Sequence, residues 1–293
     1  MSEQLPPVDV IHDIGYRHYD GPRLGRGYAT RSLYTLSLRG SFGLGRSIKS
    51  KILPMGLLAL MCVPALIIVA VAVYLKSGKL PLEYERYLSI MDFVIAVFIA
   101  SQAPVALSRD LRFMTLPLYF SRPITAGDYV RAKFAAMFSA MFVLTGLPLL
   151  IMWIGSLLAS MGFAYNLEHF GYGLVGAALY SLLYSAIGLA VASATPRRGF
   201  GVAGIIMLLL ISGAVATIIY FVINRHDQSA AAHWANVLSP SGLVDSSVTW
   251  MFKLPVSGAT GVPSALGGCV FVAEALLLPA AVYGLLVQRY RKI

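Results

Sequence analysis

Six long apolar stretches dominate this sequence, and each is long enough to cross a membrane as a helix. Crossing a hydrocarbon core of roughly 30 Å takes about 20 apolar residues, because only a helix satisfies every backbone hydrogen bond within its own segment. The second stretch is the weakest of the six, because Asp92, Gln102 and Pro104 interrupt it. The pattern predicts an all-α membrane protein with six transmembrane helices. The stretches cover residues 52–75, 90–107, 134–161, 170–194, 200–223 and 265–287.

The composition supports the same class and excludes an ordinary soluble enzyme. Hydrophobic residues make up 58% of the chain and charged residues only 12%, whereas a soluble domain carries about a quarter charged residues. The net charge of +10 would suggest a nucleic-acid ligand in a soluble protein. In a membrane protein, basic residues follow the topology instead, so we expect contact with lipid and no nucleic-acid partner.

The distribution of Lys and Arg predicts the orientation in the membrane, because short cytoplasmic loops retain basic residues. Eighteen of them lie in the N-terminal tail, in the loops after the second and fourth stretches and at the C-terminus, and five lie in the other segments. We therefore expect a plasma-membrane protein with both termini in the cytoplasm. Residues 1–51 would form a cytoplasmic leader and residues 52–293 the transmembrane domain. Within the leader, residues 28–43 show poor helical periodicity, although their basic side chains would be attracted to anionic lipid.

The loop at 108–133, between the second and third stretches, contains a short segment bracketed by Pro117 and Pro123. Neither proline suits the interior of a continuous helix. Thr125 and Asp128 form a pair of the capping-box type, so the third helix should begin well before its apolar part. We expect a short helix held across the inner face of the membrane.

On the predicted outer side, residues 224–261 are too apolar for a free linker and too short for a separate domain. Trp234, Trp250 and Phe252 have the amphipathic rings that favour the membrane interface. The segment therefore predicts an interfacial or re-entrant hairpin between the fifth and sixth helices.

Metal binding is not expected in this chain. Cys62 and Cys269 lie inside apolar stretches, which favours small buried side chains over a disulfide or a cysteine metal site. His226, Asp227 and His233 fall within eight residues of one another, but a zinc site would need a further ligand and supporting hydrogen bonds.

Two segments resemble those of a known membrane-protein family. The loop after the second stretch reads Leu111-Arg-Phe-Met-Thr-Leu-Pro-Leu-Tyr-Phe-Ser-Arg-Pro-Ile-Thr-Ala-Gly-Asp-Tyr-Val-Arg-Ala-Lys133, and it resembles the corresponding cytoplasmic loop of type-2 permease subunits of bacterial ABC transporters. The leader reads Gly15-Tyr-Arg-His-Tyr-Asp-Gly-Pro-Arg-Leu-Gly25, and it is similar to the N-terminal signature of actinobacterial permeases of this type. The six stretches and the long outer loop extend the resemblance over nearly the whole chain.

This resemblance implies an exporter made of two permease copies and two copies of a separate ATPase subunit. ATP and Mg²⁺ would bind to the ATPase, and this chain would bind no cofactor. A coupling helix would sit in a groove of the ATPase, and by position residues 236–257 would form a re-entrant hairpin. The implied coupling residues are Arg109, Asp110, Arg112, Leu116, Pro117, Leu118, Tyr119, Phe120, Ser121, Arg122 and Pro123.

The residues themselves agree with an external motor. A phosphate-binding loop needs the pattern Gly-x-x-x-x-Gly-Lys-Ser/Thr, whereas Gly78-Lys79 is followed by Leu80. We therefore do not expect the chain to be an enzyme by itself. An intramembrane enzyme is disfavoured as well, because we find no His, Asp and Glu constellation at acid–base spacing.

Three polar residues inside the apolar stretches, Glu274, Tyr180 and Tyr184, are candidates for lining a substrate pathway. Glu274 lies inside the sixth stretch, where an ionised side chain costs about 3 kcal/mol unless it faces protein or water; it either lines the pathway or ties that helix to a neighbour. Tyr180 and Tyr184 could line the same pathway, although the small residues around them, such as Gly188, favour close helix packing. Asp92 lies near the outer end of the second stretch, where the interface can solvate it. The alternative function is a motor-independent carrier or channel that uses Glu274 and Asp92.

Overall fold

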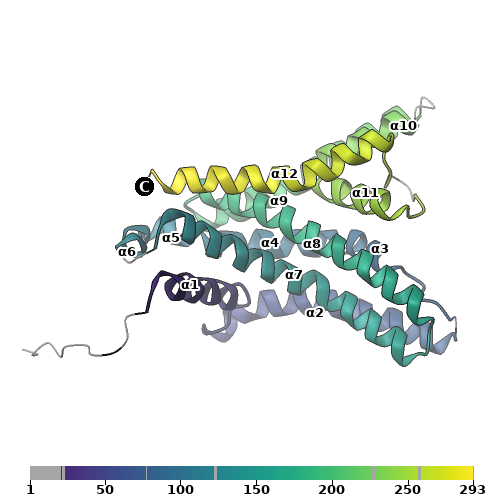
Figure 1. Ribbon diagram of the computed structural model, residues 1–293, viewed down its shortest axis with the longest axis horizontal. Helices are drawn as coiled ribbons and strands as arrows, with labels where there is room; N and C mark the ends of the chain where they lie inside the picture. The colour runs from purple at the N-terminus through teal and green to yellow at the C-terminus, as the bar shows by residue number, and fades with distance from the viewer. Residues whose placement is uncertain are drawn as a thin grey trace, which may run out of the picture.

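A computed structural model describes residues 21, 24–76, 78–121, 124–225, 229–256 and 259–292. The described part is built from helices (Figure 1), and six of them are long and apolar enough to cross a membrane. The predicted all-α class with six apolar helices is therefore confirmed. The six are α2 (Ile48–Tyr74), α4 (Asp92–Ala106) with its continuation α5 (Ser108–Arg112), α7 (Ala126–Leu158), α8 (Phe163–Ala194), α9 (Arg198–Asn224) and α12 (Ala265–Tyr290).

The long helices run side by side, so the bundle has two ends with different short helices (Figure 1). One end carries α5, α6 (Leu116–Phe120) and the C-terminal end of α12, and we call it the α6 end. The opposite end carries α3 (Tyr84–Ile90), α10 (Ser229–Ala232), η1 (His233–Leu238) and α11 (Pro240–Phe252), and we call it the α3 end. The segment predicted as a hairpin forms α10, η1 and α11, which pack against α8, α9 and α12.

The long helices differ in how much of their surface the bundle covers. Most of α4 and α8 is buried among the other helices, whereas α2, α9 and α12 leave most of their apolar side chains exposed. Exposed apolar surface on this scale is normal for a chain surrounded by lipid and costly in water. Both of these interior helices, α4 and α8, also carry polar side chains.

Two helices begin earlier than the apolar stretches indicate. The third stretch starts at residue 134, but α7 starts at Ala126 because Thr125 and Asp128 form the predicted capping box. The Thr125 hydroxyl accepts from the Asp128 backbone N–H, and the Asp128 carboxylate accepts from the Thr125 backbone N–H. Similarly, α8 starts at Phe163, directly after Gly162, although its first turns carry polar residues.

A further helix, α1 (Arg26–Ser41), forms in the leader despite its poor amphipathic periodicity. It lies along α7 and also contacts α4. Leu33 is buried in this contact, and the Tyr34 hydroxyl donates to the Ser139 hydroxyl at 3.0 Å. The leader therefore packs on the bundle through α1. The first part of the leader motif, through Asp20, lies outside the described residues.

The contact between α4 and α8 depends on Gly188. A Cβ at this position would lie 2.5 Å from Cγ1 of Ile99 and 3.1 Å from Cβ of Ala103, both of which are fully buried. A side chain at this position would force Ile99 to shift, since non-bonded carbon atoms do not approach each other to 2.5 Å. The small residues around Tyr184 therefore serve helix packing, as their spacing favoured.

We predict that Gly188→Ala lowers the free energy of unfolding by about 1 to 3 kcal/mol, because the added methyl group overpacks the buried contact. The matched control is Gly171→Ala in the same helix, where a Cβ would meet no atom within 4 Å. There, the better helix propensity of alanine should leave stability unchanged or raise it by up to about 1 kcal/mol. Thermal unfolding of both purified variants measures the difference, and equal melting temperatures would contradict the packing argument.

Candidate functional site

The segment between α4 and α7 forms a compact projection at the α6 end. A turn connects α5 to α6, and Met114 within it has a φ of +51°, in the left-handed region. Helix α6 covers Leu116–Phe120, so a short helix is present where the prolines predicted one. Two residues predicted to complete it, Arg122 and Pro123, lie outside the described residues.

One side of α6 is fixed to the bundle through aromatic contacts. The rings of Tyr119 and Phe120 lie 5.8 and 6.2 Å from the ring of Tyr129 on α7. Tyr129 in turn packs against Tyr290, near the end of α12, at 5.2 Å. Leu116 is buried beside them. Together these contacts join α6 to both α7 and α12.

The other side of the projection presents large apolar side chains. Leu118 is 69% exposed, and Phe113 and Met114 are 64% and 75% exposed. Arg109 and Arg112 are exposed beside them. An apolar surface rimmed by basic side chains, on a short helix fixed from behind, has the properties of a protein-binding surface.

Asp110, predicted as part of this surface, is buried instead. Its carboxylate forms an ion pair with Lys133 Nζ at 2.8 Å and accepts a hydrogen bond from the Tyr129 hydroxyl at 2.9 Å. Lys133 also donates to the Ala106 carbonyl at 2.9 Å. These contacts fasten the junction of α4 and α5 to α7, so Asp110 holds the projection in place rather than offering a contact to a partner.

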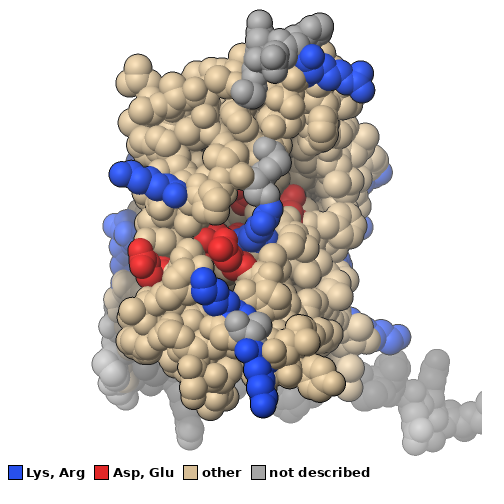
Figure 2. Space-filling model, turned by 90° about the vertical axis from the view of Figure 1, so that its right-hand side faces the viewer, with Lys and Arg blue, Asp and Glu red and all other residues tan. Residues whose placement is uncertain are grey.

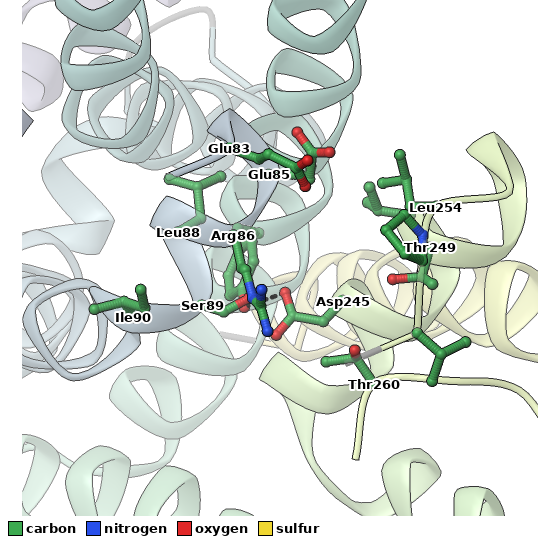
Figure 3. Close-up of a pocket in the computed structure, with 15 residues that line it drawn as sticks. Glu83, Glu85, Arg86, Leu88, Ser89, Ile90, Asp245, Thr249, Leu254 and Thr260 are labelled. Carbon is green, nitrogen blue, oxygen red and sulfur yellow. Dashed lines mark hydrogen bonds between the residues drawn. The ribbon is translucent and has the colours of Figure 1, made fainter. Parts of the chain in front are cut away.

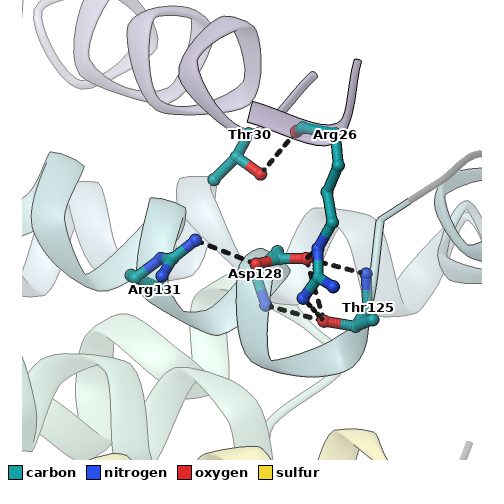
Figure 4. Close-up of polar contacts among 5 residues, drawn as sticks. All are labelled: Arg26, Thr30, Thr125, Asp128 and Arg131. Atoms are coloured by element: carbon teal, nitrogen blue, oxygen red, sulfur yellow. Dashed lines mark hydrogen bonds and ion pairs between the residues drawn. The ribbon is translucent and has the colours of Figure 1, made fainter. Parts of the chain in front are cut away.

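A second ion-pair group joins α1 to the same region (Figure 4). Asp128 at the start of α7 lies between Arg26 of α1, at 2.5 Å, and Arg131, at 2.9 Å. Arg26 also donates to the Thr125 hydroxyl. Both arginine side chains are largely exposed, so solvent screening makes these pairs weak. The Arg26–Asp128 pair therefore orients the start of α1 relative to α7 and contributes little to the stability of the fold.

We predict that Lys133→Met lowers the free energy of unfolding by about 3 to 5 kcal/mol, because it leaves the Asp110 carboxylate buried without its cation. The double variant Lys133→Met with Asp110→Leu should be more stable than the single variant, since it removes both charges. Chemical denaturation of the two purified variants tests this order. The reverse order would show that the pair is not effectively buried.

At the α3 end, Tyr180 and Tyr184 form the centre of a buried polar cluster. The Tyr180 hydroxyl donates to Asp245 of α11 at 2.8 Å, and the Tyr184 hydroxyl donates to Asp92 of α4. The two rings lie 5.5 Å apart, and both side chains are almost completely buried. Two residues predicted as pathway candidates thus connect α8 to α4 and α11. Asp92, expected to be solvated at the interface, is hydrogen-bonded inside this cluster.

Glu274 does not belong to the cluster. It is half-buried on α12, and it forms no hydrogen bond or ion pair within the described part of the chain. The two acidic residues of the alternative function, Asp92 and Glu274, therefore share no interaction. Of the candidate zinc ligands, His226 and Asp227 lie outside the described residues, and His233 Nδ1 lies 3.2 Å from the Ala259 carbonyl. No group of three metal-ligating residues occurs in the described ranges.

Asp245 is a member of the cluster that sequence patterns did not reveal. Its pKa is raised to about 7, chiefly by burial and also by the nearby Asp92 carboxylate, although hydrogen bonds from Ser89 and Tyr180 lower it. An aspartate with a pKa this high titrates at neutral pH. The groups that face it are Asp92 on α4, Tyr180 and Tyr184 on α8, and Ser89 on α3.

We predict that the melting temperature falls as the pH rises through the interval between 3.8, the ordinary pKa of aspartate, and about 7. Over this interval the folded protein holds a proton that the unfolded chain has released, so folding is favoured at the lower pH. The loss on full ionisation is on the order of 4 kcal/mol. Asp245→Asn should flatten this part of the profile, and an unchanged slope in that variant would assign the titration to another group.

Comparison with known proteins adds no assignment. No family model matches the chain, and no curated protein matches it at a significant level.

Proposed function

We propose that this chain is the permease subunit of an ATP-driven exporter of the type-2 ABC class, coupled through α6 to a separate ATPase. The observation that carries the proposal is the form of the α5–α6 projection. It connects two membrane-length helices, one side is fixed by Tyr129, and the other side exposes Leu118, Phe113 and Met114. A partner that moves α6 would act on α7 through the rings of Tyr119 and Phe120, which pack against Tyr129. The Asp110–Lys133 pair joins the neighbouring α5 to α7.

The charge distribution supports a cytoplasmic position for the α6 end. The segments predicted to be cytoplasmic carry eighteen basic and six acidic residues, which gives +12, while the outer segments carry five of each. Basic residues are retained in the cytoplasm, where anionic lipid also attracts them. We therefore place the protein in the plasma membrane of a bacterium with both termini inside, and the α6 end is where a cytoplasmic ATPase would dock.

In this proposal the transporter contains two copies of the chain and two ATPase subunits. ATP and Mg²⁺ bind to the ATPases, whose closure pushes on α6 of each permease. The spans then change between two packed arrangements, which is the form that coupled transitions take in proteins. The carrier or channel without a motor is less well supported, because its two acidic residues, Asp92 and Glu274, share no interaction.

We predict that Leu118→Glu abolishes binding of the ATPase while the permease still folds in the membrane, because most of this side chain is exposed. The chain would be tagged and purified from its own cells, and ATPase subunits with a phosphate-binding loop would be identified in the eluate. Phe113→Glu should act in the same way.

The matched control is Leu158→Glu, an 83% exposed leucine at the other end of α7, which should leave co-purification unchanged. Tyr119 is less suitable for this test, because its ring packs against Tyr129 and its loss would also disturb the bundle. Undiminished recovery of the ATPase with Leu118→Glu and Phe113→Glu would overturn the coupling role of α6.

A further inference from the structure

A cavity of about 430 Å³ lies at the α3 end, between α3, α8 and α11 (Figure 3). Pockets for small molecules usually measure about 300 to 1,000 Å³, so this one has room for a ligand of modest size. Figure 2 looks onto this end and shows acidic side chains gathered across the middle of the face, some of them recessed below the surface. The cavity lies away from the α5–α6 projection, at the opposite end of the bundle.

The charged side chains of the cavity are mostly acidic. Glu83, Glu85 and Asp245 lie on its lining, and Arg86 is the one basic side chain among the described residues there. Arg86 is exposed and forms no ion pair within the described part of the chain. Three carboxyl groups and one guanidinium thus line the cavity, which leaves an excess of acidic groups. An arrangement of this kind attracts cations.

Glu85 lacks a hydrogen-bond donor that its position requires. Its side chain is only 10% exposed, and its Oε1 atom lies 3.1 Å from His169 Nδ1. The other carboxylate oxygen, Oε2, is buried and has no hydrogen-bond partner among the described residues. A buried acceptor without a donor costs about 1 to 3 kcal/mol, and more when it is charged. A bound N–H donor of positive charge would remove this cost.

Apolar side chains also line the cavity, beside the hydroxyl groups of Ser89, Thr249 and Thr260, and they would contact the uncharged part of a ligand. Leu88 of α3 and Val248 of α11 line the cavity, and so does Leu254 in the segment that follows α11. A metal ion does not suit this site, because the three carboxylates are not grouped so that they could hold one ion together, and no such group occurs among the described residues. The lining instead combines acidic groups with hydrocarbon walls, as required for an amine that carries an apolar group.

We propose that this cavity binds a small organic cation whose ammonium group pairs with the Glu85 carboxylate and whose apolar body packs against Leu88, Val248 and Leu254. Asp245 and Glu83 supply the surrounding negative charge. Binding of this kind needs only the cavity, so it holds whether or not the chain works with an ATPase.

The test is equilibrium binding to the purified full-length protein at about pH 8, where the carboxylates are ionised and aliphatic amines carry a proton. The probes are 2-phenylethylamine, its neutral analogue 2-phenylethanol and its anionic analogue phenylacetate, which share one ring and differ in charge. The amine should bind at least about tenfold more tightly than either analogue, a difference of about 1.4 kcal/mol. Equal binding of the amine and the alcohol, or no saturable binding of the amine, would overturn the proposal.

Variants locate the site. Glu85→Gln should weaken amine binding at least about tenfold, because the amide keeps the shape and removes the charge. Glu168→Gln is the matched control. Glu168 is an exposed glutamate at the same end, it accepts a hydrogen bond from Tyr172, and it lies outside the cavity lining. This variant should bind the amine with wild-type affinity.

A third variant keeps the test decisive if Glu85→Gln does not fold. Leu254→Trp places a larger ring at the border of the cavity and leaves every carboxylate in place, so it should block the amine without changing the charge. Thermal unfolding confirms that each variant is folded. Wild-type affinity in Leu254→Trp, or an equal loss in Glu85→Gln and Glu168→Gln, would show that the amine binds elsewhere.

Discussion

Polar side chains placed among membrane-length helices must find partners within the protein, and this constraint explains how the bundle is held together. Lipid offers no hydrogen bonds, so an unpaired polar group at membrane depth is expensive. The chain meets the requirement with pairs that cross between helices. Asp110, Lys133 and Tyr129 join the junction of α4 and α5 to α7 at one end, and Tyr180 and Tyr184 join α8 to α11 and α4 at the other. Hydrogen bonds and ion pairs are directional, whereas apolar contacts are not. These polar contacts therefore specify how the helices are oriented against one another.

The most buried helices, α4 and α8, carry three side chains of the polar cluster at the α3 end, namely Asp92, Tyr180 and Tyr184. Their close contact depends on Gly188, so packing and polar pairing reinforce each other. The helices with exposed apolar surfaces, α2, α9 and α12, need no such groups, and Glu274 on α12 is an exception. It is half-buried and has no partner in the described part of the chain. A charged residue in that position is stable only where protein or water meets it, so Glu274 marks a stretch of α12 that faces something other than lipid tails alone.

Apolar stretches and local helix chemistry were sufficient to predict much of the fold. Six apolar helices of membrane length follow from hydropathy, and the start of α7 follows from the Thr125–Asp128 pair, because both depend on residues close together in the sequence. The interior polar cluster was only half predicted. Tyr180 and Tyr184 could be identified by their spacing, but their partners are 65 and 92 positions away, and pairing over such separations is set by tertiary packing. Glu85 and Asp245 gave no local pattern, and the cavity that they line exists only where α3 meets α8 and α11.

The two ends of the bundle offer different kinds of surface, and the same helices connect them. At the α6 end, apolar side chains project from a fixed helix, which suits a protein partner. At the α3 end, acidic groups line a recess, which suits a small cation. Helix α7 begins at the first end and reaches the second, where α3 packs against both α7 and α8. A displacement of α6 carried along α7 would therefore reach the helix that bears Glu85. The proposed ATPase surface at α6 and the proposed cation cavity are thus connected through the packed helices α7 and α3. Coupling between the two sites requires these helices to move as rigid units rather than to bend.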